Sequence, residues 1–133
     1  MRSRKRIAFE GAGITMPVTG LDHVQIAIPD GGEDAARRFF VDLLGMREIP
    51  KPGVLSPKGC WFASGSANIH VGVDPDFKPA RKAHPALLVD ELDGMRASLA
   101  TAGYPVLDDR PIPGIRRFFT EDPFGNRIEI IQN

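Results

Sequence analysis

The stretch LDHVQIAI at residues 21–28 decides the fold, because a second stretch, AHPALLVD at residues 83–90, repeats its pattern. Each is a short apolar run with a histidine near its start, which is typical of a β-strand. Each is followed by a helical pattern that ends at a glycine, with His23 lying 22 residues before Gly45 and His84 lying 19 before Gly103. Such internal repetition indicates two copies of one structural unit.

The order β-α-β-β-β is predicted twice. Apolar residues at helical spacing predict helices over 33–44 and 90–102. The predicted strands are 21–28, 46–49, 59–63 and 68–73 in the first half and 84–89, 104–107, 115–120 and 127–131 in the second half. We therefore expect an α+β fold in which two βαβββ modules form curled mixed sheets around a shared cleft. The expected divisions are a loose N-terminal extension over 1–20 and a single domain over 21–133, with module one at 21–76, a connector at 74–82 and module two at 83–133.

Composition limits the classes of protein to consider. The 133 residues suit one domain, and 17 basic against 17 acidic side chains provide no overall charge to attract nucleic acid or an anionic membrane. The single cysteine, Cys60, excludes an intrachain disulfide and favours a cytoplasmic protein, most simply with a buried thiol. No apolar run approaches the roughly 20 residues of a membrane span.

Three histidines and one carboxylate have the placement that a metal site would need. His23, His70, His84 and Glu129 each sit in a different predicted strand, and the chain has no other histidine. A lone histidine in a strand is usually an ordinary core or edge residue. Three imidazoles and one carboxylate that converge would suit a borderline divalent ion: Zn, Fe, Mn, Co or Ni.

The sequence from Leu21 to Gln132 resembles the vicinal oxygen chelate superfamily, the glyoxalase, bleomycin-resistance and dioxygenase fold. The resemblance rests on four segments in order: LDHVQIAI at 21–28, RFFVDLLGM at 38–46, AHPALLVD at 83–90 and DPFGNRIE at 122–129. It implies that the metal ligands are His23, His70, His84 and Glu129, although relatives often carry Glu or Gln where His70 stands. His70 could instead be a substrate contact or could orient another ligand. Pro85 is a small departure that should place the start of its strand at a sheet edge.

The resemblance implies a small metal-dependent enzyme of the isomerase, lyase or dioxygenase type that chelates two adjacent oxygens of a small metabolite. Glu129 or a metal-bound hydroxide would move the proton. The alternatives are a metal-free binding protein of the bleomycin-resistance kind, which sequesters a small molecule, and a structural or regulatory member. The resemblance also implies a homodimer, with the site within one chain or shared between two. Four further residues are candidates for substrate binding: Gln25, Trp61, Phe119 and Arg117, the last of which could equally be a solvated surface charge.

Overall fold

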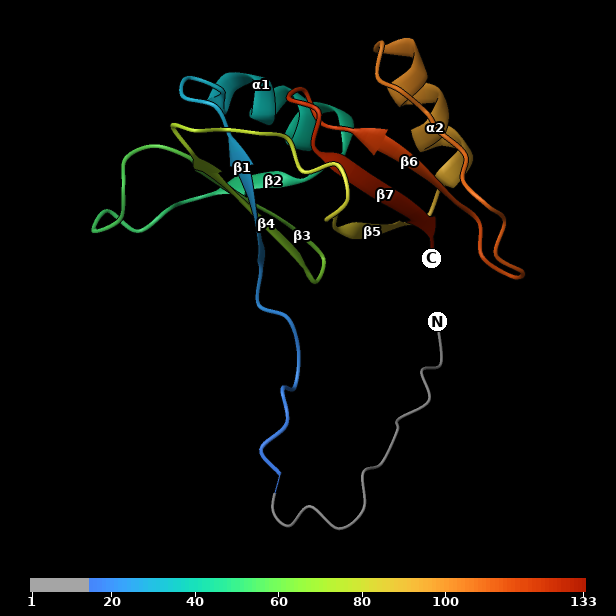
Figure 1. Ribbon diagram of the computed structural model, residues 1–133, viewed down its shortest axis with the longest axis horizontal. Helices are drawn as coiled ribbons and strands as arrows, with labels where there is room; N and C mark the ends of the chain where they lie inside the picture. The colour runs from blue at the N-terminus through green and yellow to red at the C-terminus, as the bar shows by residue number, and fades with distance from the viewer. Residues whose placement is uncertain (1–14) are drawn as a thin grey trace.

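The computed structural model describes residues 15–133 and contains two small sheets. The first sheet has the order β1-β4-β3-β2 and the second has the order β5-β7-β6 (Figure 1). Their strands are β1 (Val24–Ile28), β2 (Arg47–Ile49), β3 (Cys60–Ser64), β4 (Ala67–Val73), β5 (Ala86–Val89), β6 (Arg117–Glu121) and β7 (Arg127–Gln132). In each sheet the first strand of the module pairs in parallel with the last, and the last pairs antiparallel with the strand before it. The predicted α+β class and its internal repeat are therefore confirmed.

One helical segment follows the first strand of each module. The first begins as α1 (Glu33–Arg37) and continues as the π-helical η1 (Arg38–Leu43), and the second is α2 (Leu92–Thr101). The π-helical turns differ from the regular helix expected over 33–44. Because i to i+5 bonding puts more residues in each turn, neighbouring side chains are separated by a smaller angle. Both Phe39 and Phe40 are fully buried in these turns.

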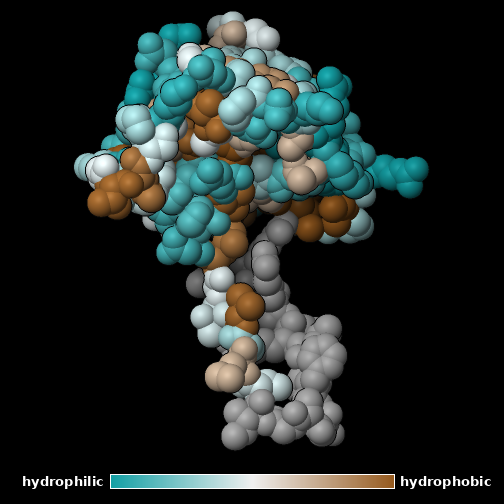
Figure 2. All heavy atoms as spheres, turned by 60° about the vertical axis from the view of Figure 1, so that its left-hand side comes forward, coloured by the Kyte–Doolittle hydropathy of each residue, from teal (hydrophilic) through white to brown (hydrophobic). Residues whose placement is uncertain are grey.

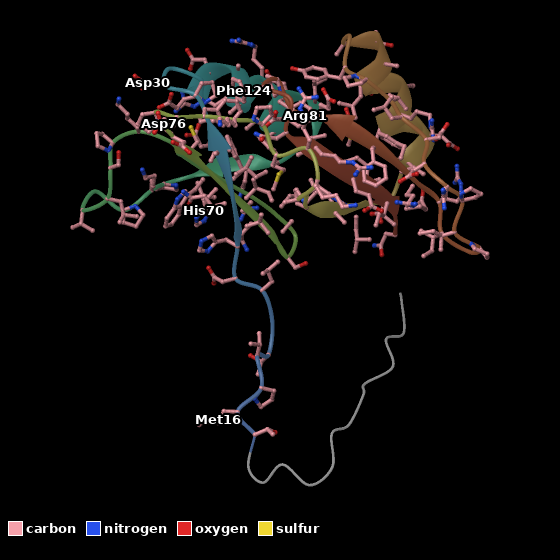
Figure 3. The ribbon with its side chains drawn as sticks, in the orientation of Figure 1. Met16, Asp30, His70, Asp76, Arg81 and Phe124 are labelled. Carbon is pink, nitrogen blue, oxygen red and sulfur yellow. The ribbon has the colours of Figure 1, made fainter. Side chains whose placement is uncertain are left out.

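Alternation along the strands separates a core face from an open face in both sheets. Ile26 and Ile28 of β1 are buried, whereas Gln25 between Val24 and Ile26 is exposed. The core is one continuous cluster of apolar side chains from both sheets and both helical segments. Figure 3 shows the side chain of His70 on the opposite face of its sheet from α1. The candidate site residues therefore lie on the faces that the core leaves free.

The first strand of each module begins later than predicted, and one expected strand is missing. β1 begins at Val24 and β5 at Ala86, so His23 and His84 both lie just before a strand. Pro85 has no N–H to donate to a ladder, which accounts for the later start of β5. Residues 104–107 form no strand and contribute a single bridge from Leu107 to Phe119. Pro105 lies in the middle of that segment and likewise cannot donate a backbone hydrogen bond.

Besides the shared core, one buried side chain links the two modules through hydrogen bonds. The amide nitrogen of Asn126 donates to the carbonyl oxygen of Ala27 in β1 at 2.9 Å and to the carboxylate of Asp122 at 2.8 Å. Its amide oxygen accepts from the backbone N–H of Ala80 in the connector at 2.9 Å. Asn126 thus ties module one, the connector and module two together.

Residues 15–23 contain no helix or strand and lead away from the body of the molecule (Figure 1). Figure 2 shows hydrophobic side chains along this extended segment, and Met16 is 95% exposed. The loose extension expected over 1–20 remains a prediction, because residues 1–14 lie outside the described part. Among residues 15–133, no helix is both long enough and apolar enough to cross a membrane.

Candidate metal and substrate site

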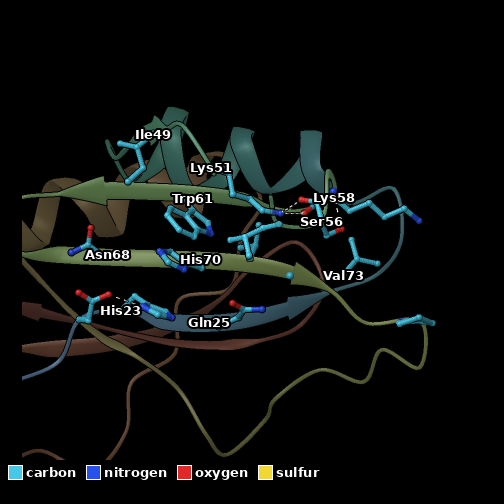
Figure 4. Close-up of a pocket in the computed structure, with 15 residues that line it drawn as sticks. His23, Gln25, Ile49, Lys51, Ser56, Lys58, Trp61, Asn68, His70 and Val73 are labelled. Atoms are coloured by element: carbon cyan, nitrogen blue, oxygen red, sulfur yellow. Dashed lines mark hydrogen bonds and ion pairs between the residues drawn. The ribbon is translucent and has the colours of Figure 1, made fainter. Parts of the chain in front are cut away.

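Three aromatic rings form a column across the open face of the first sheet. The ring of His70 in β4 stacks on Trp61 in β3, with centroids 4.0 Å apart and planes 7° apart. The ring of His23 stacks on the other face of His70, again at 4.0 Å and with planes 14° apart. Figure 4 shows the three side chains in a row. Because the rings stack on one another, their edges, which carry the nitrogen atoms, are the parts left to meet a ligand.

His23 is oriented by the residue before it. Its Nδ1 lies 2.9 Å from a carboxylate oxygen of Asp22. A carboxylate accepts hydrogen bonds, so Nδ1 is the ring nitrogen that donates, and Nε2 makes no hydrogen bond within residues 15–133. Burial and the neighbouring His23 lower the pKa of His70, which favours the neutral imidazole that a metal ion requires.

His84 and Glu129 form a second pair, on the other sheet. The Nδ1 of His84 lies 2.8 Å from the carbonyl oxygen of Lys82, which can only accept, so Nδ1 carries a proton. Nε2 lies 3.0 Å from Oε1 of Glu129. A neutral imidazole with that tautomer would place a lone pair against a carboxylate oxygen. The pair therefore requires a proton or a metal ion between the two atoms, and Glu129 is only 12% exposed.

Positive charge surrounds this second pair. Nη1 of Arg117 lies 3.3 Å from Oε2 of Glu129, and its guanidinium stacks over the ring of Phe119. Arg127 lies over the same ring, 3.9 Å from its centroid. Phe119 also meets the ring of His84 edge to face, at 5.2 Å. Cross-strand pairing of Phe119 with Glu129 puts these groups on one face of the second sheet.

The four expected ligands form two pairs within one chain rather than one group of four. His23 lies with His70, and His84 lies with Glu129. Across residues 15–133, no three His, Cys, Asp or Glu side chains come together as a metal site. The four side chains therefore do not converge within the described part of one chain, and a site shared between two chains remains a prediction. The reason is that the two modules share their core through the opposite faces of their sheets.

A cleft of about 700 Å³ lies between the modules, with His23 and His84 both in its walls. A larger cleft, of about 740 Å³, lies over the first sheet and contains both expected ligand-contacting residues of that module, Gln25 and Trp61. Phe119 and Arg117 lie beside Glu129 on the second sheet, as described above. The role of all four of these residues in substrate binding remains a prediction.

Sequence reasoning missed the groups that orient the ring nitrogens. Asp22 is adjacent to His23, and an acidic neighbour of a candidate ligand was an available signal for it. The carbonyl oxygen of Lys82 gave no such signal, because every residue has one. Asn68 also lines the cleft over the first sheet, two residues before His70 on the same strand face.

Comparisons with known proteins agree with this architecture. A glyoxalase family protein from Bacillus anthracis is 45% identical, with a TM-score of 0.84 over 90% of this chain and 99% of that chain. The fosfomycin resistance protein FosX from Listeria monocytogenes, at 18% identity, has a TM-score of 0.68 over 88% of this chain and 93% of that chain. TnmS3, an antibiotic binding protein from Streptomyces, is 22% identical, with a TM-score of 0.70 over 89% of this chain and 98% of that chain.

No protein of curated function matches the sequence. Residues 20–130 match the Glyoxalase/Bleomycin resistance protein/Dioxygenase superfamily, which covers both modules and the connector between them. Together with the 45% identity to the Bacillus anthracis protein, this match establishes that the chain belongs to the glyoxalase, bleomycin resistance and dioxygenase superfamily.

Proposed function

We propose that this protein is a metal-dependent enzyme of the isomerase, lyase or dioxygenase type, active as a homodimer. In this proposal each site takes His23 and His70 from one copy and His84 and Glu129 from the other. The observation that carries the proposal is the contact between His84 and Glu129, in which Nε2 lies 3.0 Å from a carboxylate oxygen while Nδ1 faces the carbonyl oxygen of Lys82. An imidazole and a carboxylate held side by side in this way would supply two of the ligands that a divalent cation needs.

Both strands that border the proposed sites are unpaired at one edge. β1 pairs with β4 alone and β5 with β7 alone among the described strands. Their sequences, VQIAI and ALLV, carry no charge, proline or bulge to discourage pairing. Leu88 in β5 is 59% exposed. Contact between β1 of one copy and β5 of another would cover these edges and bring the two pairs of ligands together.

The residues have distinct roles in this proposal. Asp22 and the Lys82 carbonyl engage Nδ1 of His23 and of His84, so that Nε2 of each ring is the nitrogen that would bind the ion; in the single chain Nε2 of His84 already faces Glu129. A bound divalent ion would polarise two adjacent oxygens of the substrate and stabilise negative charge that develops on them. Glu129 would hold or accept the proton released from the substrate, and Arg117 keeps its second oxygen in place.

Subunit complementation tests the shared site. A dimer of the His23→Ala variant contains no intact site, and neither does a dimer of the Glu129→Ala variant. A mixed dimer of the two has one site in which both changes meet and one site that is intact. After unfolding and refolding of an equal mixture, we expect roughly a quarter of the wild-type metal content, because half of the dimers are mixed at random. The readout is elemental analysis after chelator treatment and metal loading.

The matched control is a mixture of His23→Ala with His70→Ala. Both changes fall in the same half of the site, so no mixed dimer contains an intact site and no metal should return. A wild-type protein that binds metal while neither mixture regains any would place the site within one chain. If the wild-type protein binds no divalent metal, the proposed metal-dependent activity is wrong, and a protein that sequesters a small molecule is favoured instead.

A further inference from the structure

The charged side chains of the cleft over the first sheet already have partners. The ammonium group of Lys51 donates to the carbonyl oxygens of Ser56 and Lys58, which closes the loop at the rim. Lys58 itself pairs with Asp30 at 2.9 Å, and Asp22 pairs with His23. These contacts engage both lysines at the rim, and Asp30 offsets the charge of Lys58, which weakens the attraction of this cleft for an anionic ligand.

Three uncharged side chains of the same cleft that can form hydrogen bonds have no such partners. Gln25, Asn68 and the indole of Trp61 all line the cleft, and none of their side chains makes a hydrogen bond within residues 15–133. Amide groups both donate and accept, and the indole N–H donates. Pockets with a few such groups among apolar walls select a ligand by its hydrogen bonds rather than by its charge.

The absence of a side chain at Gly72 leaves room for the carboxamide of Gln25. The two residues lie on neighbouring strands, β1 and β4. A Cβ at position 72 would collide with Nε2 of Gln25, and Gly72 has no positive φ that would itself demand glycine. Glycine at position 72 therefore allows the carboxamide of Gln25 to lie across β4, on the open face of the sheet.

We propose that Gln25 and Asn68 bind an uncharged, oxygen-bearing group of the substrate, such as a hydroxyl or a carbonyl. The part of the substrate above β1, β4 and β3 is then neutral, and any anionic group lies toward Arg117 and Arg127 on the other half of the site. The inference rests on the proposed function in taking this cleft as a substrate site, but it does not depend on a bound metal.

A single indole signal makes the inference testable at the cleft itself. Trp61 is the only tryptophan, so its N–H gives one resolvable resonance in a ¹⁵N–¹H spectrum of the full-length, chelator-treated protein. Titration with catechol, which is uncharged near neutral pH, should shift this resonance with saturation. Salicylate, which has a similar shape but carries a carboxylate, should bind at least about tenfold more weakly at the same resonance.

Two variants test whether Gln25 causes the preference for catechol over salicylate. Gln25→Leu replaces the carboxamide with an apolar side chain of similar volume. Gly72→Ala keeps the carboxamide of Gln25 but displaces it from its position over β4. Both should reduce the catechol affinity about tenfold, the worth of one good hydrogen bond. Thr101→Ala, at the exposed end of α2, is the matched control and should behave like wild type.

The outcomes separate this inference from the metal proposal. Salicylate binding as tightly as catechol, or a preference that survives both variants, would overturn the neutral subsite whatever the metal content. Absence of any catechol effect on the indole resonance would overturn it as well. Selective catechol binding that disappears in the variants would support it even in a protein that fails the complementation test.

Discussion

At the scale of single residues, the arrangement of hydrogen-bond partners around each histidine says more than the histidines themselves. His23 and His84 belong to different modules, yet each has its Nδ1 beside an oxygen that lies close in the sequence, which leaves Nε2 to face the site; in His84 this nitrogen meets Glu129. The oxygens come from unrelated sources, a side chain in one case and a backbone carbonyl in the other. This shared orientation is what a metal ligand needs, because it fixes both the tautomer and the direction of the ring.

The Asp22 contact can be tested separately from the ligand that it orients. If the proposed metal site is correct, Asp22→Ala should weaken metal binding about 10- to 100-fold, because Nδ1 of His23 loses its acceptor. Calorimetric titration with Zn²⁺ gives the affinity. Asp34→Ala removes another exposed carboxylate, paired with Arg37 on the surface, and should leave the affinity unchanged. Equal affinities for the two variants would exclude an orienting role for Asp22.

Cys60 should be unreactive in the folded protein. Its side chain is 1% exposed, and burial raises the pKa of its thiol to about 11. At pH 8 roughly one thiol in a thousand would be the reactive thiolate, before any account of steric access. We therefore expect slow reaction with a disulfide reagent in native buffer and rapid reaction of one thiol in denaturant. Fast native labelling would contradict the burial of β3.

At the scale of elements, the turn between β6 and β7 holds the modules together. Asn126 is 2% exposed and bonds to three parts of the chain, and Asp122 accepts from its backbone and side chain. Burial raises the pKa of Asp122. Its folded pKa therefore lies above the unfolded value, so this carboxyl favours the folded state most when protonated, and that contribution falls as pH rises through the folded pKa.

Asn126→Ala should destabilise the protein by about 2–4 kcal/mol, because it leaves the Ala27 carbonyl and the Ala80 N–H without their partner. The urea midpoint of unfolding measures the change. Asn133→Ala is the control, since that exposed side chain makes one hydrogen bond, to Asp90 at 3.2 Å, and should cost less than about 0.5 kcal/mol. Similar midpoints for both variants would show that the turn does not join the modules energetically.

At the scale of the whole molecule, the placement of the core decides the form of the site. Both sheets bury their apolar faces in one cluster with the helices, so the faces that carry histidines and Glu129 are left to solvent or to a partner. Two uncovered edge strands, β1 and β5, border these faces. Association of two copies along these edges would therefore complete the sheets and the sites in the same step.

Leu88→Lys should favour the monomer if β5 is an interface edge. Leu88 lies on the open face of β5 with Ala86, and a lysine there would place a charge against an apolar edge. Sedimentation velocity should show a smaller species, with metal content lost at the same time if the site is shared. Val54→Lys changes another exposed apolar residue, in a loop and at 94% exposure, and should not alter the mass.

The sequence by itself determined the two modules, the family and the identity of the four candidate ligands, because hydrophobic periodicity and repeated motifs are local properties of the chain. It also determined which residues share a strand face, since alternation fixes that wherever a strand forms. It did not exclude a strand over residues 104–107, where Pro105 removes the donor that a ladder needs. Only the tertiary structure decided that His23 and His70 lie apart from His84 and Glu129. The physical reason is that burial of the opposite sheet faces against shared helices sets how the modules dock, and this docking depends on packing between residues far apart in the chain.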